Sequence, residues 1–339
     1  MRAAIRSLLG FCLLVAAACA GVPPSVPVGA QPLPLQIHSQ PLVLKLDEPA
    51  LRRVGKLIWR GGISMTANSP NFGGWSDLYV SPDGKSLSSI SDEGSWLTAA
   101  IDYDADGNLH GLSNGRIGSL RGLDGLPLRD KVMADAEGMA LLPDGSWLVA
   151  FERQHRFWRY PTLDGTPTPI EGPVDLGRQP NNGGIEAVTA LRDGTIIAIS
   201  EEYVVNPGML RGWIGRPAGG PAGGRRYSWQ TFDYAKTPDF NPTALAQMPD
   251  GSFVLLERAF DMVRGVRIRV MQFDAAEVKA GGTVRAKELA WLAPPYAADN
   301  LEGVFARQGA RGETLLWLIS DDNFNRVQRN ILLMFELTP

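Results

Sequence analysis

Two short apolar runs joined by a turn recur five times along the chain, and each copy begins and ends on polar residues. The copies cover residues 76–93, 137–153, 186–202, 243–258 and 302–322. A typical copy has apolar residues at 139–142 and again at 147–151. Runs of this length bounded by turn residues are typical of β-strands. A repeated unit of this size indicates a repeat architecture.

The turn between the two runs has the same chemistry in the first four copies. It carries an Asp-Gly pair at 83–84, 144–145, 193–194 and 250–251. Asp-Gly tolerates the positive φ angles of tight hairpins, so each copy is predicted to be a β-hairpin. A polar residue stands seven positions before each of these Asp residues, namely Ser76, Glu137, Glu186 and Thr243. The fifth copy replaces the pair with a Gly-rich loop at 308–313.

The spacing of the hairpins predicts a β-propeller. The Asp-Gly turns lie about 50 to 60 residues apart, which is enough for four short strands and their loops. We therefore expect an all-β, six-bladed propeller, with five blades as the alternative. The sixth blade would join a strand near 42–46 or 57–59 to the C-terminal strand at 331–337. Joining the two ends in one blade closes the ring and removes free edges.

This architecture gathers polar residues at one mouth of the central channel. The innermost strand of a blade runs along the channel and the second strand returns, so the start of one and the end of the other share a face. The second strands end at 92–93, 152–153, 201–202, 257–258 and 321–322, all of which are acidic or acidic-basic pairs. Carboxylates crowded in this way raise one another's pKa unless cations compensate them.

A hard divalent cation, Ca²⁺ above all, would supply that compensation, since it takes six to eight oxygen ligands. The metal-ligand candidates are Glu137, Glu186, Glu201, Glu302 and Asp321. The chain has three His residues, which makes a His-rich zinc site improbable; His155, beside the 152–153 corner, is a further acid–base candidate. The interpretation in which acids and arginines form structural ion pairs between blades stays open.

Four residues are candidates for catalysis. Arg153 and Arg258 would receive phosphate oxygens, because a guanidinium matches them in forked geometry. Glu152 or Glu257 would act as the general base. No Gly-x-Ser-x-Gly elbow is present, so serine-hydrolase chemistry is not supported.

The N-terminus resembles an export signal. Residues 1–20 contain two Arg, then an apolar stretch, then small residues. Cleavage is expected either after Ala20 or before Cys19, where lipidation would anchor the protein to a membrane. A Pro-rich linker at 21–40 and a propeller domain at 41–339 would follow. We expect the protein in the periplasm or lipid-anchored to a bacterial envelope.

Charge and cysteine content exclude several classes. Both cysteines, Cys12 and Cys19, lie in the signal, so the mature domain has no disulfide or thiolate site. Removing the signal takes two of 33 basic residues and none of 36 acidic ones, which leaves 31 against 36, or −5. An acidic balance argues against nucleic-acid binding. The expected partner is a small-molecule phosphoester or ester, and the expected state is a monomer.

Eight stretches together resemble the bacterial phytase-like family, described as "esterase-like activity of phytase". They are Phe72-Gly73-Gly74-Trp75-Ser76, Ser91-Asp92-Glu93-Gly94, Asp135-Ala136-Glu137-Gly138, Phe151-Glu152-Arg153 with Arg156-Phe157-Trp158-Arg159-Tyr160, Asn182-Gly183-Gly184-Ile185-Glu186-Ala187, Leu256-Glu257-Arg258, Asp299-Asn300-Leu301-Glu302-Gly303 and Ser320-Asp321-Asp322-Asn323-Phe324-Asn325. The resemblance implies an exported propeller that hydrolyses phosphoesters or esters. The motifs of the calcium-dependent propeller phytases themselves are not found here.

Three functions remain as hypotheses. The first is metal-assisted hydrolysis of a phosphoester or ester at the acidic mouth, by a phytase-like, esterase-like hydrolase. The second is a non-catalytic propeller of the cell envelope that binds a ligand or a protein. The third is a sugar-lactone hydrolase, a chemistry that other six-bladed propellers perform with one central divalent ion.

Overall fold

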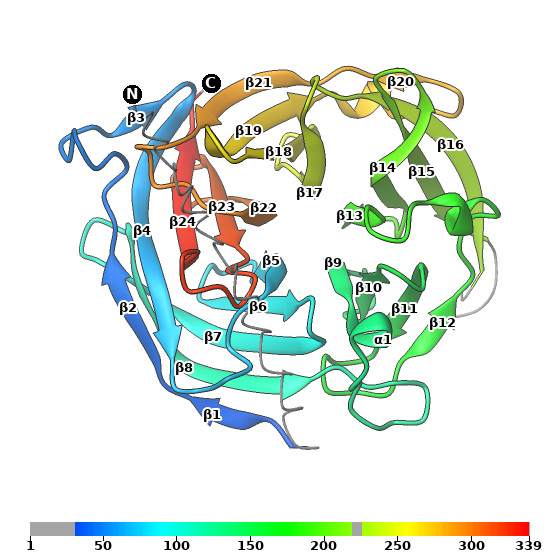
Figure 1. The fold of residues 1–339 in the computed structure, drawn as a ribbon, viewed down its shortest axis with the longest axis horizontal. Coiled ribbons are helices and arrows are strands. Elements are labelled where there is room, and N and C mark those ends of the chain that lie inside the picture. The colour runs from blue at the N-terminus through cyan, green and yellow to red at the C-terminus, as the bar shows by residue number, and fades with distance from the viewer. Residues whose placement is uncertain (1–30, 219–225, 339) are drawn as a thin grey trace, which may run out of the picture.

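The structure, a computed structural model, describes residues 31–218 and 226–338. Five sheets, antiparallel apart from the pair of β16 with β20, stand around a central opening, with β5, β9, β13, β17 and β22 next to it (Figure 1). These innermost strands contact one another in a closed ring. The predicted all-β propeller is therefore confirmed, and the described residues form five blades, the alternative, rather than six.

Blades 1 to 3 follow one another along the chain. Blade 1 contains β5 (Trp75–Val80), β6 (Ser86–Ser91), β7 (Ser95–Tyr103), β8 (Leu109–Ser119) and, outermost, β1 (Leu33–Leu35). Blade 2 contains β9 (Ala136–Leu141), β10 (Trp147–Phe151), β11 (Arg156–Tyr160) and β12 (Thr168–Ile170). Blade 3 contains β13 (Ile185–Ala190), β14 (Ile196–Asn206), β15 (Met209–Pro217), β16 (Tyr227–Ala235) and the short parallel β20 (Thr283–Val284).

Blades 4 and 5 complete the ring, and the strands of blade 5 explain why the described residues form no sixth blade. Blade 4 contains β17 (Asn241–Gln247), β18 (Phe253–Asp261), β19 (Gly265–Phe273) and β21 (Lys287–Leu292). Blade 5 contains β22 (Leu301–Gln308), β23 (Thr314–Ser320), β24 (Asn330–Leu337), β4 (Leu57–Ala67) and β2 (Ile37–Pro41), with β3 (Arg53–Val54) beside β4. The predicted N- and C-terminal strands do pair, β4 with β24, but they complete the fifth repeat.

The predicted hairpins form with the expected turn chemistry. Gly84, Gly145, Gly194 and Gly251 all have φ between 74° and 89°, a region that favours glycine. The Asp before each glycine accepts a hydrogen bond from the backbone N–H two residues after itself, at 2.9 to 3.0 Å. This Asx turn fixes the loop and so sets the register of both strands.

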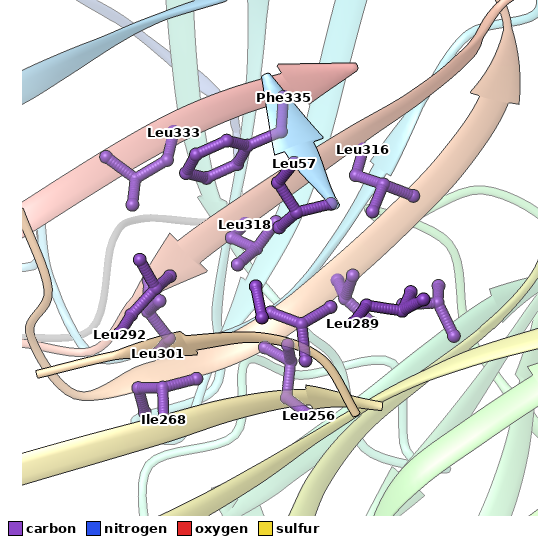
Figure 2. Packing of buried hydrophobic residues seen from close by; sticks show 14 of the residues in the cluster. Leu57, Leu256, Ile268, Leu289, Leu292, Leu301, Leu316, Leu318, Leu333 and Phe335 are labelled. Atoms are coloured by element: carbon purple, nitrogen blue, oxygen red, sulfur yellow. The ribbon is translucent and has the colours of Figure 1, made fainter. Parts of the chain in front are cut away.

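Apolar side chains fill each of the five spaces between neighbouring blades. The cluster between blades 4 and 5 is drawn in Figure 2, where Leu256, Ile268 and Leu292 face Leu318 and Phe335. Because both faces of a blade are covered, central strands such as β18 and β23 are buried almost continuously rather than alternately. This packing fills the spaces between the blades with apolar side chains.

Three short helical segments complete the structure: α1 (Lys131–Ala134), η1 (Leu176–Arg178) and η2 (Ala275–Glu277). No helix in the described ranges is long and apolar enough to cross a bilayer. The predicted export signal and both cysteines lie outside the described residues. The last residues of the predicted linker lie within the propeller, since β1 pairs with β8 and β2 with β4.

Candidate functional site

A β-bulge in every blade presents one polar residue at the same mouth of the channel. In blade 2, Ala136 pairs with Phe151 and Gly138 pairs with Ala150, so Glu137 between them has no partner. The register shifts in the same way in the other four blades, and the five unpaired residues are Ser76, Glu137, Glu186, Thr243 and Glu302. A bulge redirects a side chain and is common beside active sites. The repeated slot of the sequence is thus a repeated bulge.

A second set of polar residues follows the end of the second strand. The N–H groups of Asp92, Glu152, Glu201 and Asp321 each donate to the carbonyl two residues before the bulge, at 2.7 to 2.9 Å. In blade 4 the residue in this place is Arg258, because the pairing of Pro242 with Glu257 puts Glu257 one position earlier. A cation therefore replaces the fourth carboxylate of the series.

Glu257 does not join the other candidates. Its side chain is fully buried, and Oε1 accepts hydrogen bonds from Tyr234 Oη and Thr237 N, both at 2.9 Å. Neither partner is one of the predicted site residues, and Tyr234 belongs to β16 of blade 3. The structure gives Glu257 a place between two blades. Glu257 is therefore not assigned the role of general base.

Five carboxylates form a continuous arc across blades 2 and 3. Asp135, Glu137 and Glu152 have oxygen atoms that all lie within 4.8 Å of one another, and so do Glu152, Glu186 and Glu201. Glu152 belongs to both groups. Three of the five predicted metal ligands, Glu137, Glu186 and Glu201, thus lie in this arc, while Glu302 and Asp321 lie outside both groups.

Cations neutralise one end of the arc, at Asp135. Lys131 Nζ lies 2.7 Å from Asp135 Oδ1 and 2.6 Å from Asp92 Oδ2. Burial alone would lower the pKa of Lys131, but attraction to Asp92 and Asp135 raises it. Arg153 Nε also pairs with Asp135. Neither Lys131 nor Asp135 was a site candidate from the sequence alone. The one sequence feature that marks Asp135 is its position two residues before Glu137, the unpaired residue of the bulge.

Arg258 neutralises the other end. Its guanidinium pairs with Glu302, lies 3.3 Å from Glu201 Oε1, and donates to Asn300 Oδ1 at 2.6 Å. Arg258 of blade 4 is therefore the cation that pairs with Glu302 of blade 5. These contacts involve both terminal nitrogens of Arg258. Phosphate binding by Arg258 would require them to be exchanged, and this role remains a prediction.

The middle of the arc has no cation. Neither Glu137 nor Glu186 forms an ion pair with any described residue, and Glu186 Oε2 is buried without a hydrogen-bond partner. Burial, followed by repulsion from Asp135, raises the pKa of Glu137 well above its usual value. Burial, followed by repulsion from Glu201, does the same to Glu186. An ionised carboxylate in this place would be strongly stabilised by a bound cation.

Glu152 is held in place by the backbone. Its Oε1 accepts hydrogen bonds from the N–H groups of Gly183 and of Gly184, the latter at 2.8 Å. Burial raises the pKa of Glu152, and these two N–H groups oppose that rise. The carboxylate is therefore held in one orientation, and its Oε2 accepts no hydrogen bond from any residue that the structure describes.

The donor set suits a hard cation. All atoms that approach one another in the arc are carboxylate oxygens, which Ca²⁺ prefers. His155 is not part of it, since its Nε2 lies 2.8 Å from Pro180 O and burial lowers its pKa. The residues present thus fit a calcium-like ion held by Glu186 and Glu201, with Glu152 beside it.

Two further carboxylates near the mouth have raised pKa values. Burial, followed by repulsion from Asp92, raises the pKa of Asp321 to about 8. Burial raises the pKa of Asp92 to about 6, although Lys131 opposes the rise. Deeper in the channel, Asp77 is buried against the N–H groups of Leu78 and Met139, and burial raises its pKa well above its usual value.

The family comparison agrees with the resemblance found in the sequence. The family model described as "Phytase-like: Esterase-like activity of phytase" matches residues 70–324. That span includes all five bulges and all five residues of the arc. No curated protein matches the chain.

Several solved structures are similar to the chain at low sequence identity. A protein of unknown function from Dyadobacter fermentans is 12% identical, with a TM-score of 0.41 and coverage of 93% of this chain and 97% of that one. The Myceliophteria thermophila Cps50 (Swd1) β-propeller domain is 9% identical, with a TM-score of 0.38 and coverage of 90% and 100%. A provisionally named gluconolactonase is 13% identical, with a TM-score of 0.38 and coverage of 79% and 90%. At these values the similarities carry no argument about activity.

Proposed function

The chain belongs to the phytase-like family, described as having the esterase-like activity of phytase, and from this we propose that it hydrolyses a phosphoester or ester with a divalent cation at the acidic mouth. One observation supports the proposal above the others. Carboxylates from two blades converge on Glu152, and two of them, Glu137 and Glu186, form no ion pair with any described residue. Glu186 Oε2 is buried without a hydrogen-bond partner among the described residues.

We assign the cation to Glu186 and Glu201, with Glu137 and Glu152 beside it. A bound divalent ion would polarise the ester and lower the pKa of a water. Glu152 would take the proton from the attacking water, because its carboxylate is fixed by two N–H groups and its Oε2 is free.

Arg153 would bind the ester or phosphate oxygens. Its Nε is paired with Asp135, which leaves the two terminal nitrogens for a substrate, and its side chain is 30% exposed. Its backbone has φ 55°, a conformation that costs a non-glycine residue about 1–3 kcal/mol and is enriched at functional sites. The ion pair with Asp135 stabilises this strained corner and aims the guanidinium at the mouth.

The test combines elemental analysis with turnover of a phosphomonoester, a carboxylate ester and a lactone. We expect the purified mature domain to retain Ca²⁺ and to hydrolyse the phosphomonoester or ester, and a chelator to abolish both. Glu186→Gln should lose both, whereas Glu171→Gln, an exposed carboxylate on blade 2's side of the ring, should lose neither. Turnover that survives the chelator would exclude the metal-assisted reaction. Saturable ligand binding without any turnover would favour a binding propeller.

We also propose that the protein is exported and acts as a monomer on a small molecule. The support is the basic and apolar N-terminal sequence ending at Cys19 and Ala20. Fractionation of cells and metabolic labelling with a fatty acid test this directly. Labelling that disappears in Cys19→Ala would identify a lipoprotein, and an unlabelled periplasmic protein would identify cleavage after Ala20.

A further inference from the structure

A groove opens beside the acidic arc, on the side of blades 4 and 5. Its volume is about 810 Å³, and Glu201, Arg258 and Asn300 line the end that meets the arc. The loop after β23 and the hairpin of β18 and β19 contribute its other walls, including Val327 and Phe260. A group attached to an ester held at the arc would extend into this groove.

Five amide side chains make up half of the polar lining residues of the groove. They belong to Asn241, Asn300, Asn323, Asn325 and Gln328. An amide offers two donors and an acceptor in one group, so it can satisfy the mixed donor and acceptor character of hydroxyl groups. Asn323 is exposed, and among the described residues its side chain makes no hydrogen bond. It is thus available to a ligand.

The backbone that carries Asn323 is strained and firmly held. Asn323 and Phe324 have φ of 48° and 47°, and such values are rare for a phenylalanine. The N–H of Asn323 donates to Asp321 Oδ1 at 2.6 Å, and the N–H of Phe324 donates to Asp322 Oδ1 at 3.3 Å. A strained loop persists only when its surroundings fix it, and such loops cluster at ligand sites.

The charges of the groove exclude a polyanion. Glu202, Asp239 and Asp299 line it together with Glu201, while Arg258 is the single cation among its lining residues. Arg258 is already paired with two carboxylates. A ligand with several phosphates would therefore meet net repulsion along the groove, although one phosphate could still be held at the arc.

The polar groups exclude a purely apolar chain. Covering the amides and carboxylates with an alkyl group would leave them without partners, at about 1–3 kcal/mol for each group. The exposed large apolar side chains of the lining are Phe260, which is 63% exposed, and Val327, which is 84% exposed. These can contact the C–H face of a ring while the amides bind its edge.

We propose that this groove binds a neutral sugar unit, the alcohol part of the ester that the arc hydrolyses. Hydroxyl groups would donate to Asp239 and Glu202 and accept from the amide of Asn323, and the C–H face of the sugar would lie on Phe260. Sugar binding itself requires neither the cation nor turnover. Only the statement that this sugar is the alcohol part of the hydrolysed ester rests on the proposed function.

The experiment measures binding of maltotriose, cellotriose and N,N′-diacetylchitobiose to the full mature protein in a chelator, by saturation-transfer NMR and titration. We expect at least one of them to bind. Asn323→Gly removes the amide and suits the φ of 48°, and it should weaken that binding at least tenfold, as should Phe260→Ser. The matched control is Asn114→Gly, an exposed asparagine with φ 50° on β8, which should leave binding unchanged.

The outcomes separate this inference from the proposed function. Sugar binding without hydrolysis of any ester would uphold the groove and refute the hydrolase. Hydrolysis of a phosphomonoester without binding of any of the three sugars would refute the groove alone. Equal loss of binding in Asn323→Gly and Asn114→Gly, or binding of 1-octanol in place of the sugars, would also overturn the inference.

Discussion

Replacing Glu186 with glutamine should stabilise the protein without calcium and remove its response to calcium. Glu186 Oε2 is buried without a partner, and burial raises the pKa of this carboxyl well above its usual value. A group with a raised folded-state pKa favours the folded state at low pH, and this contribution is lost as pH rises through that pKa. The advantage of Glu186→Gln in the calcium-free protein should therefore grow with pH.

The magnitude follows from the size of the domain and from linkage. Residues 31–218 and 226–338 amount to about 300 residues, which at about 2.1 cal/mol/K per residue gives an unfolding entropy of about 0.6 kcal/mol/K. Calcium at one hundred times its Kd adds about 2.7 kcal/mol, or a rise in Tm of about 4 °C. Removing an unsatisfied buried carboxylate oxygen is worth about 1–3 kcal/mol, or about 2–5 °C.

Thermal unfolding at pH 8, in a chelator and then in millimolar Ca²⁺, provides the measurement. We expect the wild type to gain Tm on adding calcium, and Glu186→Gln to start higher and gain almost nothing. Glu171→Gln, an exposed acid, should behave as the wild type in both conditions. A Glu186→Gln protein that is less stable without calcium, or that keeps the full calcium response, would refute the reasoning.

Three further predictions concern the same mouth. Because the pKa of Asp321 is raised to about 8, the calcium-free wild type should lose stability as the pH rises from about 4 to about 8. The Asp321→Asn variant should lose less stability over the same range. Equal losses of the two proteins in urea titrations would contradict this prediction. Glu302→Gln takes a partner from Arg258 and should destabilise by about 1–2 kcal/mol in the same titrations, opposite in sign to Glu186→Gln. Glycine at position 153 suits the φ of 55°, so the Arg153→Gly protein should keep its free energy of unfolding within about 1 kcal/mol of the wild type. Its KM for a phosphoester should rise about tenfold. An unchanged KM would show that Arg153 does not bind the substrate.

The sequence determined the hairpins and the face on which the polar residues gather. The turn chemistry of Asp-Gly acts within a few residues, so its effect could be read locally and is present in all four predicted turns. The even spacing of the copies then indicated a ring, and a ring places equivalent residues at one mouth. This route led to Glu137, Glu186 and Glu201 as candidates, and the structure places them in one arc; their role as metal ligands remains a prediction.

Ring closure and charge pairing were decided only by the tertiary structure. The ring has five blades rather than six because β4 completes the sheet of β22 to β24. Whether β4 joins that sheet or starts another depends on how the blades pack side by side into a closed ring. Which acids meet a cation depends on contacts between blades, such as that of Arg258 with Glu302, 44 residues apart. Neither appears in local patterns, because both arise from distances between segments remote in sequence. The shift of Glu257 away from the mouth has the same origin: pairing register is set by the neighbouring strand, and a displacement by one residue turns a side chain to the opposite face.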